Sequence, residues 1–375
     1  MSGIYIHIPF CKQACHYCNF HFSTSLRLKD EMINSICKEI TLRKNYLANN
    51  ILNSIYFGGG TPSLMNADDL SKIFETINKY FQWSPESEIT LEANPDDVDN
   101  KKLKIFKTYG INRLSIGIQS FFDADLKWMN RAHNSKEALD SIKVAQGEGF
   151  SNISIDLIYG SPTTSDDMWK KNIELALESD VPHISSYCLT VEEKTALFHQ
   201  IQHKKTTAPD LERANIQFDA LIKSLTSAGF DHYEISNFAK KHHIAIHNTN
   251  YWKGQSYLGI GPSAHSYNGQ SRSWNVANNK KYIDSINKEI LPIETEFLTP
   301  SIRYNEYIMT GLRTMWGVNS DEISVLGDMY RVHFLSNIVK EIDSGLVHIC
   351  DDQYVLTERG KYFADRIAMN LFFVN

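Results

Sequence analysis

The sequence predicts an α/β fold in which a partial barrel of six strand–helix units is followed by a small, mainly helical domain. Three observations support this prediction. Short apolar runs alternate with longer amphipathic stretches over the first 230 residues. Residues of distinctive chemistry stand where the runs end. The alternation stops after about residue 229, which separates the barrel from the rest of the chain.

The six apolar runs have the composition of strands. They are rich in Ile, Leu, Tyr and Phe and are bounded by Gly, Pro or Asn. Because they lack a clean alternation of polar and apolar residues, we expect a sheet that is buried on both faces. Helical connections between them predict parallel strands with right-handed crossovers. The runs cover residues 4–8, 54–57, 88–93, 113–118, 153–158 and 184–189.

The stretches between the runs have helical periodicity. In the second of them, Leu70, Ile73 and Ile77 recur at helical spacing, and Asn66 with Asp69 resembles a capping arrangement at its start. Six units are too few for an eight-unit barrel and fit either an open, partial barrel or a doubly wound sheet. The predicted helices cover residues 29–46, 67–80, 100–109, 135–146, 167–178 and 210–228.

Chemically distinctive residues stand at the end of every predicted strand. Functional groups of parallel α/β folds gather at the carboxyl ends of the strands, so this regular placement favours the partial barrel over the doubly wound sheet. In chain order these residues are Cys11, Gly58-Gly59-Gly60-Thr61-Pro62, Glu92 with Asn94, Gln119, Asp156 and Tyr187.

The repeat gives way to a different organisation beyond the sixth unit. Residues 231–265 are rich in His, Tyr, Asn and Gly, and we expect loops and short strands that wrap the barrel. Leu298-Thr299-Pro300 marks a boundary. After it, predicted helices at 301–316, 328–345 and 357–372, with a hairpin at 346–349 and 354–356, indicate a winged-helix-like domain. The expected division is 1–230, 231–298 and 299–375.

Composition restricts the class of function. The formal net charge of −6 argues against a general nucleic-acid binder, which is usually basic. The N-terminus has no basic region ahead of an apolar stretch and no small-residue cleavage site, and no apolar run is long enough to span a bilayer. We therefore expect a cytoplasmic protein, with peripheral membrane contact left open.

Three of the six cysteines, Cys11, Cys15 and Cys18, crowd into eight residues after the first predicted strand. Three thiolates on one short loop can hold three irons of a [4Fe–4S] cluster and leave the fourth iron open. S-adenosylmethionine (SAM) can chelate an open iron through its amino and carboxylate groups. Reduction of the cluster then cleaves SAM to a 5′-deoxyadenosyl radical.

A zinc site is the alternative interpretation of the same loop. Zinc usually takes four ligands, and His7, His16 or His21 could supply the fourth. The spacing favours the cluster, and zinc stays open at this point.

Polar residues expected at the same rim suit a charged nucleoside. Glu92, Gln119, Arg131 and Asp156 offer a cation for a carboxylate, and acceptors for ribose hydroxyls or an ammonium. Each of them alone is more often a structural hydrogen-bonding residue, but as a set they fit SAM.

These motifs resemble those of the HemN/HemW group of radical SAM proteins, and within it the heme chaperone branch. The resemblance covers essentially the whole chain and implies a partial (β/α)6 barrel with a C-terminal domain. The matching pieces are Tyr5-x-His7-Ile8-Pro9-Phe10-Cys11, the three-cysteine loop, Gly58-Gly59-Gly60-Thr61-Pro62-Ser63, Glu92-x-Asn94-Pro95, residues 113–121, residues 156–160, Tyr233-Glu234-Ile235-Ser236-Asn237 and Gly259-Ile260-Gly261-Pro262.

The resemblance also implies a role for each matching residue, with no residue assigned as catalytic. The implied roles are cluster ligation by Cys11, Cys15 and Cys18, contact with the cluster and SAM by Tyr5 and Tyr17, binding of the methionyl part of SAM by Gly59, Gly60 and Thr61, of its amino acid end by Glu92 and Arg131, and of its ribose by Gln119 and Asp156.

Two functions occur in this group. The oxygen-independent coproporphyrinogen III oxidases resemble one another in a further Cys two residues after the third ligand, where this chain has Phe20. The chaperone branch carries a His-Asn-x-x-Tyr-Trp motif associated with heme binding, and His247-Asn248-Thr249-Asn250-Tyr251-Trp252 matches it. Whether the chain is an enzyme is left open, because the oxidase is the alternative to the chaperone.

Imidazole is a good axial ligand of heme iron, and Tyr and Trp can pack on a porphyrin face. From the residues alone, His247 is more simply a loop histidine beside two anchoring aromatics, and the resemblance is what favours heme. The resemblance implies heme, a heme-acceptor protein and an electron donor as partners, with membrane association of the acceptor left open.

Overall fold

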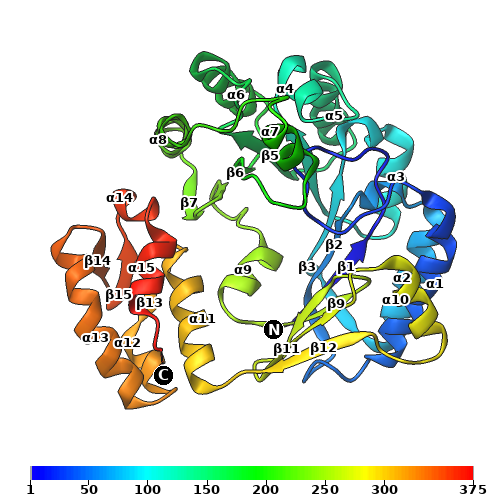
Figure 1. Ribbon diagram of the computed structural model, residues 1–375. Helices are drawn as coiled ribbons and strands as arrows, with labels where there is room; N and C mark the ends of the chain where they lie inside the picture. Colours follow the sequence, from blue (N-terminus) through cyan, green and yellow to red (C-terminus); the bar gives the residue numbers. More distant parts are fainter. Residues whose placement is uncertain (1, 375) are drawn as a thin grey trace.

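The computed structural model describes residues 2–374, and its barrel has the six predicted parallel strands (Figure 1). Successive strands pair in chain order, β1 to β6, all in parallel register. The partial α/β barrel is thereby confirmed. The strands are β1 (Ser2–Ile8), β2 (Ile51–Gly59), β3 (Gln82–Ala93), β4 (Arg113–Gln119), β5 (Asn152–Tyr159) and β6 (His183–Cys188).

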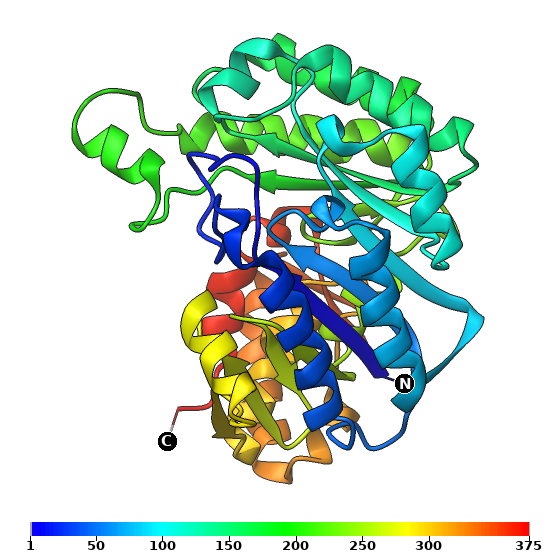
Figure 2. The ribbon, with the colours of Figure 1, turned by 90° about the vertical axis from the view of Figure 1, so that its right-hand side faces the viewer.

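Helices cover the outer side of this curved sheet (Figures 1 and 2). The six predicted helices are present, and the predicted capping box of Asn66 and Asp69 opens the second. Two short helices, α4 (Asp123–Trp128) and α7 (Ala196–Gln202), were not predicted. The six are α1 (Lys29–Leu42), α2 (Ala67–Tyr80), α3 (Asn100–Thr108), α5 (Ser135–Gly147), α6 (Asp166–Glu178) and α8 (Leu211–Ser227), and short 3-10 turns lie at Leu26–Leu28, Pro62–Leu64 and Pro95–Asp97.

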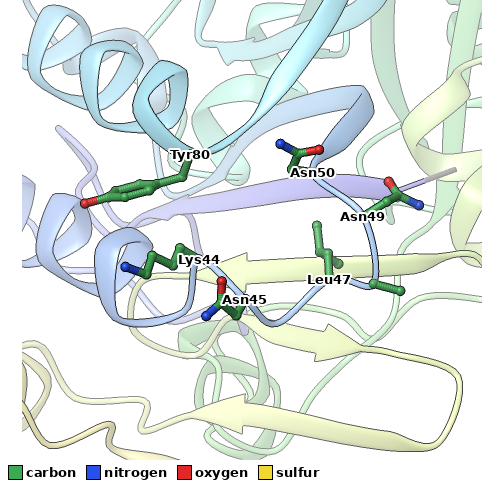
Figure 3. A pocket seen from close by; sticks show the side chains of 7 residues that line it. Lys44, Asn45, Leu47, Asn49, Asn50 and Tyr80 are labelled. Atoms are coloured by element: carbon green, nitrogen blue, oxygen red, sulfur yellow. The ribbon is translucent and has the colours of Figure 1, made fainter.

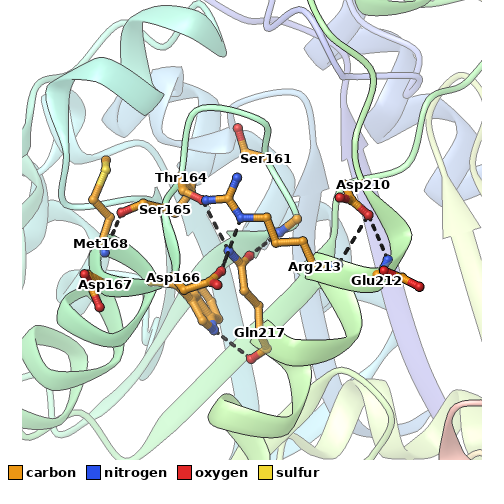
Figure 4. A network of polar contacts seen from close by, with 12 residues as sticks. Ser161, Thr164, Ser165, Asp166, Asp167, Met168, Asp210, Glu212, Arg213 and Gln217 are labelled. Carbon is orange, nitrogen blue, oxygen red and sulfur yellow. Dashed lines mark hydrogen bonds and ion pairs between the residues drawn. The ribbon is translucent and has the colours of Figure 1, made fainter.

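Polar contacts fix α8 to the loop that follows β5 (Figure 4). Arg213 donates to the carbonyl of Thr164 at 2.5 Å and to Asp166 at 3.2 Å. The side-chain oxygen of Gln217 accepts from the amide of Gly160 at 2.8 Å. Because Gln217 is buried, these bonds hold the last helix of the barrel in a fixed register against the fifth strand.

The wrapping segment is more regular than the sequence predicted. Its strands extend the sheet at both edges, with β8 antiparallel to β6 and β9 parallel to β1. The prediction of loops and short strands for 231–265 is corrected by a helix, α9 (Ile246–Trp252), which lies between the barrel and the C-terminal domain (Figure 1). The other elements are β7 (Asp231–Glu234), β8 (Asn237–Ala239), β9 (Ser256–Ile260), β10 (His265–Tyr267), β11 (Ser271–Asn275), α10 (Asn279–Asn287) and β12 (Ile293–Phe297).

The C-terminal region builds a hydrophobic core of its own around Tyr304, Phe334 and Ile367. It combines helices with the expected hairpin, to which Val318–Asn319 adds a third strand that was not predicted. The predicted last helix is interrupted after Lys361 and resumes at Ala364. Its elements are α11 (Pro300–Leu312), β13 (Val318–Asn319), α12 (Ser320–Ser324), α13 (Asp328–Asp343), β14 (Val347–Cys350), β15 (Gln353–Leu356), α14 (Glu358–Lys361) and α15 (Ala364–Leu371).

A helix that crosses a bilayer must be long and apolar. Within residues 2–374, none of the helices combines the length and the apolar character that crossing a bilayer requires.

Candidate cofactor site

The cysteine loop leaves the carboxyl end of β1 and is fixed there by its own backbone. The amide of Cys11 donates to the carbonyl of Ser23 at 3.0 Å, and the amide of Ser23 donates to that of Pro9 at 2.9 Å. The amide of Cys18 donates to the carbonyl of Cys15 at 3.3 Å. All three cysteines are partly exposed.

The far side of the loop is held by segments distant in sequence. The amide of His16 donates to the carbonyl of Met129 at 3.0 Å, and Gln13 donates to the side chain of Asn130 at 2.8 Å. The amide of Leu197, at the start of α7, donates to the carbonyl of His16 at 2.8 Å. The loop therefore has a defined shape set by α4 and α7, the two short helices that the sequence did not reveal.

The geometry favours a cluster over zinc. Each of the three histidines that could complete a zinc site is engaged elsewhere, since ring nitrogens of His7, His16 and His21 lie 2.9, 2.8 and 2.7 Å from the oxygens of other residues. Among residues 2–374, no three His, Cys, Asp or Glu side chains converge on a point where one metal ion would be held.

Two of the thiols have raised pKa values, so they would lose their protons only on binding a metal. Burial raises the pKa of Cys11, and it raises the pKa of Cys18 to about 11. Binding to iron would release these protons, as thiol ligands do. Ligation of a [4Fe–4S] cluster by Cys11, Cys15 and Cys18 stays a prediction.

Arg131 lies beside this loop. Its guanidinium donates to Sγ of Cys15 at 3.4 Å, to Oδ1 of Asn94 at 2.8 Å and to the carbonyl of Gly117 at 2.8 Å. Its Nε atom is buried and has no partner. A free donor at this point could bind the carboxylate of a ligand, which agrees with the predicted contact to the amino acid end of SAM.

The glycine run brings the end of β2 close to the cysteine loop. Gly59 has φ of +106°, and a Cβ atom on Gly60 would lie 2.6 Å from the carbonyl oxygen of Phe10. Only glycine fits both positions. Thr61 is buried and accepts from the side chain of Asn94 at 3.3 Å. The structure therefore places all three residues at the predicted rim, and their contact with the methionyl part of SAM stays a prediction.

Glu92 and Asp156 lie inside the barrel below this rim. Burial raises the pKa of Glu92 to about 7 and that of Asp156 to about 6. Oε1 of Glu92 accepts from the hydroxyl of Tyr56 at 2.8 Å, and Oε2 accepts from the amide of Gly59 at 3.2 Å. Their raised pKa values make both carboxyls candidates for a ligand site, and their contacts with SAM stay predictions.

The remaining predicted contacts are distributed around the same space. Gln119 ends β4 with φ of +66°, which turns its side chain away from the strand's regular course. Tyr5 stacks on Tyr56, with ring centroids 6.0 Å apart. Tyr17 packs against the cluster of apolar residues around Met129 and Leu197.

His247 does not lie at this rim. Its side chain is 2% exposed. Its Nδ1 lies 2.9 Å from Oγ of Ser54, and its Nε2 lies 3.3 Å from the hydroxyl of Tyr251. The predicted iron ligand is thus enclosed in the barrel with both nitrogens engaged, and ligation of a heme would require α9 to leave its place.

Sequence reasoning missed the polar residues that line the interior below the rim. Ser54, Tyr56, Glu88 and Arg113 were assigned only to strands, but they contact α9, Glu92 or one another. Counting residues in steps of two along β2 would have put Ser54, Tyr56 and Gly58 on one face. A surface depression lined by Tyr80 and residues from 44–50 lies where β2 and β3 begin, at the opposite end of the strands (Figure 3).

Comparison with known proteins agrees with this geometry. Residues 5–176 match the family model of the radical SAM superfamily. The heme chaperone HemW of Bacillus subtilis is 34% identical, over 98% of this chain and 98% of its own length.

The chain belongs to the HemW family of radical SAM proteins. The heme chaperone HemW of Mycobacterium tuberculosis is a further relative, 31% identical over 98% of this chain and 94% of its own. The solved structure of the radical SAM enzyme coproporphyrinogen III oxidase (HemN) of Escherichia coli has the same fold, with a TM-score of 0.85 over 99% of this chain and 90% of that chain at 22% identity. Membership of the HemW family implies a [4Fe–4S] cluster and SAM, for which the thiols, the carboxyls and Arg131 provide suitable groups.

Proposed function

We propose that this protein is a heme chaperone, which binds heme and passes it to an acceptor protein. The observation that carries the proposal is the intact His-Asn-x-x-Tyr-Trp motif, which occupies α9 between the interior of the barrel and the C-terminal domain. HemW relatives that are 31–34% identical over nearly the whole chain are named heme chaperones.

The end of the motif offers groups that suit a porphyrin. The Arg313 guanidinium lies 5.8 Å from the ring centroid of Trp252, and Nζ of Lys253 lies 4.1 Å from that of Trp316. A heme presents a flat apolar face and two carboxylates, and paired aromatic and cationic side chains match both. We therefore assign heme contacts to this junction of α9 and the C-terminal domain.

In this proposal the barrel holds the other cofactors. Cys11, Cys15 and Cys18 would bind the cluster, and Tyr5, Tyr17, Gly59, Gly60, Thr61, Glu92, Gln119, Arg131 and Asp156 would surround SAM. The cluster with SAM supplies one-electron reductive chemistry when bound. The residues of this chain bind and orient the two groups and exclude water from them. An electron donor and a heme acceptor at a membrane surface complete the set of partners.

A heme titration tests the proposal. Purified protein should give a saturable Soret change and should then pass its heme to an added apoprotein such as apomyoglobin. The double variant Trp252→Ala/Arg313→Ala should bind heme at least tenfold more weakly, while Lys223→Ala, an exposed change on α8, should match the wild type. The proposal fails if the Soret change is absent or does not saturate.

The alternative activity has a separate assay. Anaerobic incubation of the reconstituted protein with reductant, SAM and coproporphyrinogen III should give no decarboxylated product. Phe20, which stands where the oxidases have a further cysteine, is 69% exposed at the cluster loop. Formation of product would favour the oxidase function over the chaperone function.

A further inference from the structure

The helix α9, which carries the His-Asn-x-x-Tyr-Trp motif, is hydrogen-bonded to two strands of the barrel. Oε1 and Oε2 of Glu88, on β3, accept from the amides of His247 and Ile246 at 2.9 and 2.8 Å. Asn250 donates to the side chain of Asn53, on β2, at 3.0 Å. The helix is therefore anchored to β2 and β3, which also carry the glycine run and Glu92.

The imidazole of His247 fills a socket between the first two strands. Its ring stacks on Tyr56, with centroids 4.9 Å apart and planes inclined by 26°, and lies 6.3 Å from the ring of Tyr5. A Cβ atom on Gly3 would lie 2.7 Å from Oγ of Ser54 and 3.2 Å from Nδ1 of His247, so the socket exists only because residue 3 is glycine. Burial lowers the pKa of His247 to about 3, which keeps the ring neutral.

The residue on which His247 stacks holds Glu92. The hydroxyl of Tyr56 donates to Oε1 of Glu92 at 2.8 Å. A Cβ atom on Gly58 would lie within 3.0 Å of Tyr56, Glu92 and Tyr5, so these side chains meet with no space between them. A change in the position of the imidazole should therefore move Tyr56, and with it the Glu92 carboxyl.

We propose that His247 is a positioning residue of the SAM site, which fixes Tyr56 and through it Glu92, so that the α9 motif forms the floor of the SAM pocket. The inference rests on the proposed assignment of SAM to Glu92. It gives the first residue of the motif a role in SAM binding, while the heme contacts lie at the far end of the motif, around Trp252.

The test measures SAM and heme separately. SAM affinity is measured anaerobically by equilibrium dialysis on protein that carries its cluster, and heme affinity by Soret titration. His247→Ala and Tyr56→Phe should raise the Kd for SAM about tenfold, and Tyr56→Phe should change the Kd for heme less than twofold. The exposed neighbour His242→Ala should change neither.

His247→Phe separates positioning from iron ligation. Phenylalanine keeps a ring in the socket but has no nitrogen for iron, so it should bind SAM within about threefold of the wild type, and better than His247→Ala. Wild-type SAM affinity in His247→Ala would overturn the inference, as would a loss of heme binding in His247→Phe with SAM binding intact. If the wild type binds no heme, the proposed function fails while the comparison of SAM affinities still stands.

Discussion

The guanidinium of Arg131 donates a hydrogen bond to Sγ of Cys15 at 3.4 Å. The same side chain donates to Asn94, which follows β3, and to the carbonyl of Gly117, on β4. One partly buried cation thus joins a proposed cluster ligand to two parts of the barrel. Cations near a thiolate stabilise negative charge there. Arg131 should therefore influence both the reduction potential of a cluster and the position of SAM.

Arg131→Gln should lower the reduction potential of the cluster, because the reduced cluster is more negative and loses a charged donor. A charged hydrogen bond is worth about 1.5–3 kcal/mol, so the expected shift is roughly 65–130 mV for one electron. An EPR-monitored redox titration measures it. Lys127→Gln removes an exposed charge from α4 without touching the thiols and should leave the potential unchanged. An equal shift in both variants would point to net charge instead of this contact.

Replacing any one of Cys11, Cys15 and Cys18 by Ala should prevent stable assembly of the cluster. The loop supplies one thiolate for each of three irons, and the fourth iron is left for SAM. After anaerobic reconstitution, the wild type should contain about four irons and four sulfides per chain, and the variants less than about a quarter of that. Cys350→Ala, at an exposed cysteine outside the barrel, is the matched control. Stoichiometric zinc in place of iron would contradict the assignment.

SAM affinity should rise with pH through neutrality. Burial raises the pKa of Glu92 to about 7, so the free protein holds this carboxyl largely protonated at pH 6 and ionised at pH 8. The ionised carboxylate accepts a hydrogen bond from the SAM amino group more strongly than the neutral acid does. The Kd should therefore rise about tenfold for each pH unit below 7 and become constant above about 8.

The same pH series has two matched variants. Glu92→Gln should bind SAM weakly at every pH, with a flat profile. Asp156→Asn should move the midpoint to lower pH, because the charge of Asp156 contributes to the raised pKa of Glu92. A wild-type profile without any inflection between pH 5 and 8 would exclude Glu92 as the titrating group.

The sequence predicted the barrel well because its strands are local features. Each apolar run ends at a Gly, Pro or Asn, and the carboxyl ends of parallel strands necessarily meet, so Cys11 and Glu92 could be brought to one edge without a structure. The helix α9 was missed for the opposite reason. Its seven residues have little helical periodicity, and it is held by Glu88 and Asn53, which lie about 160 and 200 residues away.

The polar residues inside the barrel were missed because the alternation of residues along β1 and β2 was misinterpreted. In β1 and β2 the core residues Ile4, Ile6, Ile55 and Phe57 alternate with polar or small ones, but the tyrosine between Ile55 and Phe57 made the run look uniformly apolar. The contact between Tyr56 and Glu92 follows only when the pairing of β2 with β3 is known. The surroundings of His247 depend on such pairings, so the motif alone could not locate it.

Glu39→Ala should destabilise the fold more than any other single carboxyl change on α1. Glu39 is fully buried and lies 3.3 Å from the guanidinium of Arg43, and it also accepts from the amide of Gly261 and the hydroxyl of Tyr282. Its removal leaves Arg43 buried with only neutral acceptors, at a cost of about 3–5 kcal/mol in the free energy of unfolding. Urea denaturation followed by circular dichroism measures this loss, and the exposed Glu31→Ala should stay within about 0.5 kcal/mol of the wild type. Because these bonds join α1 to the strands that extend the sheet beyond β1, a loss below about 1 kcal/mol would mean that this extension is held mainly by its apolar contacts.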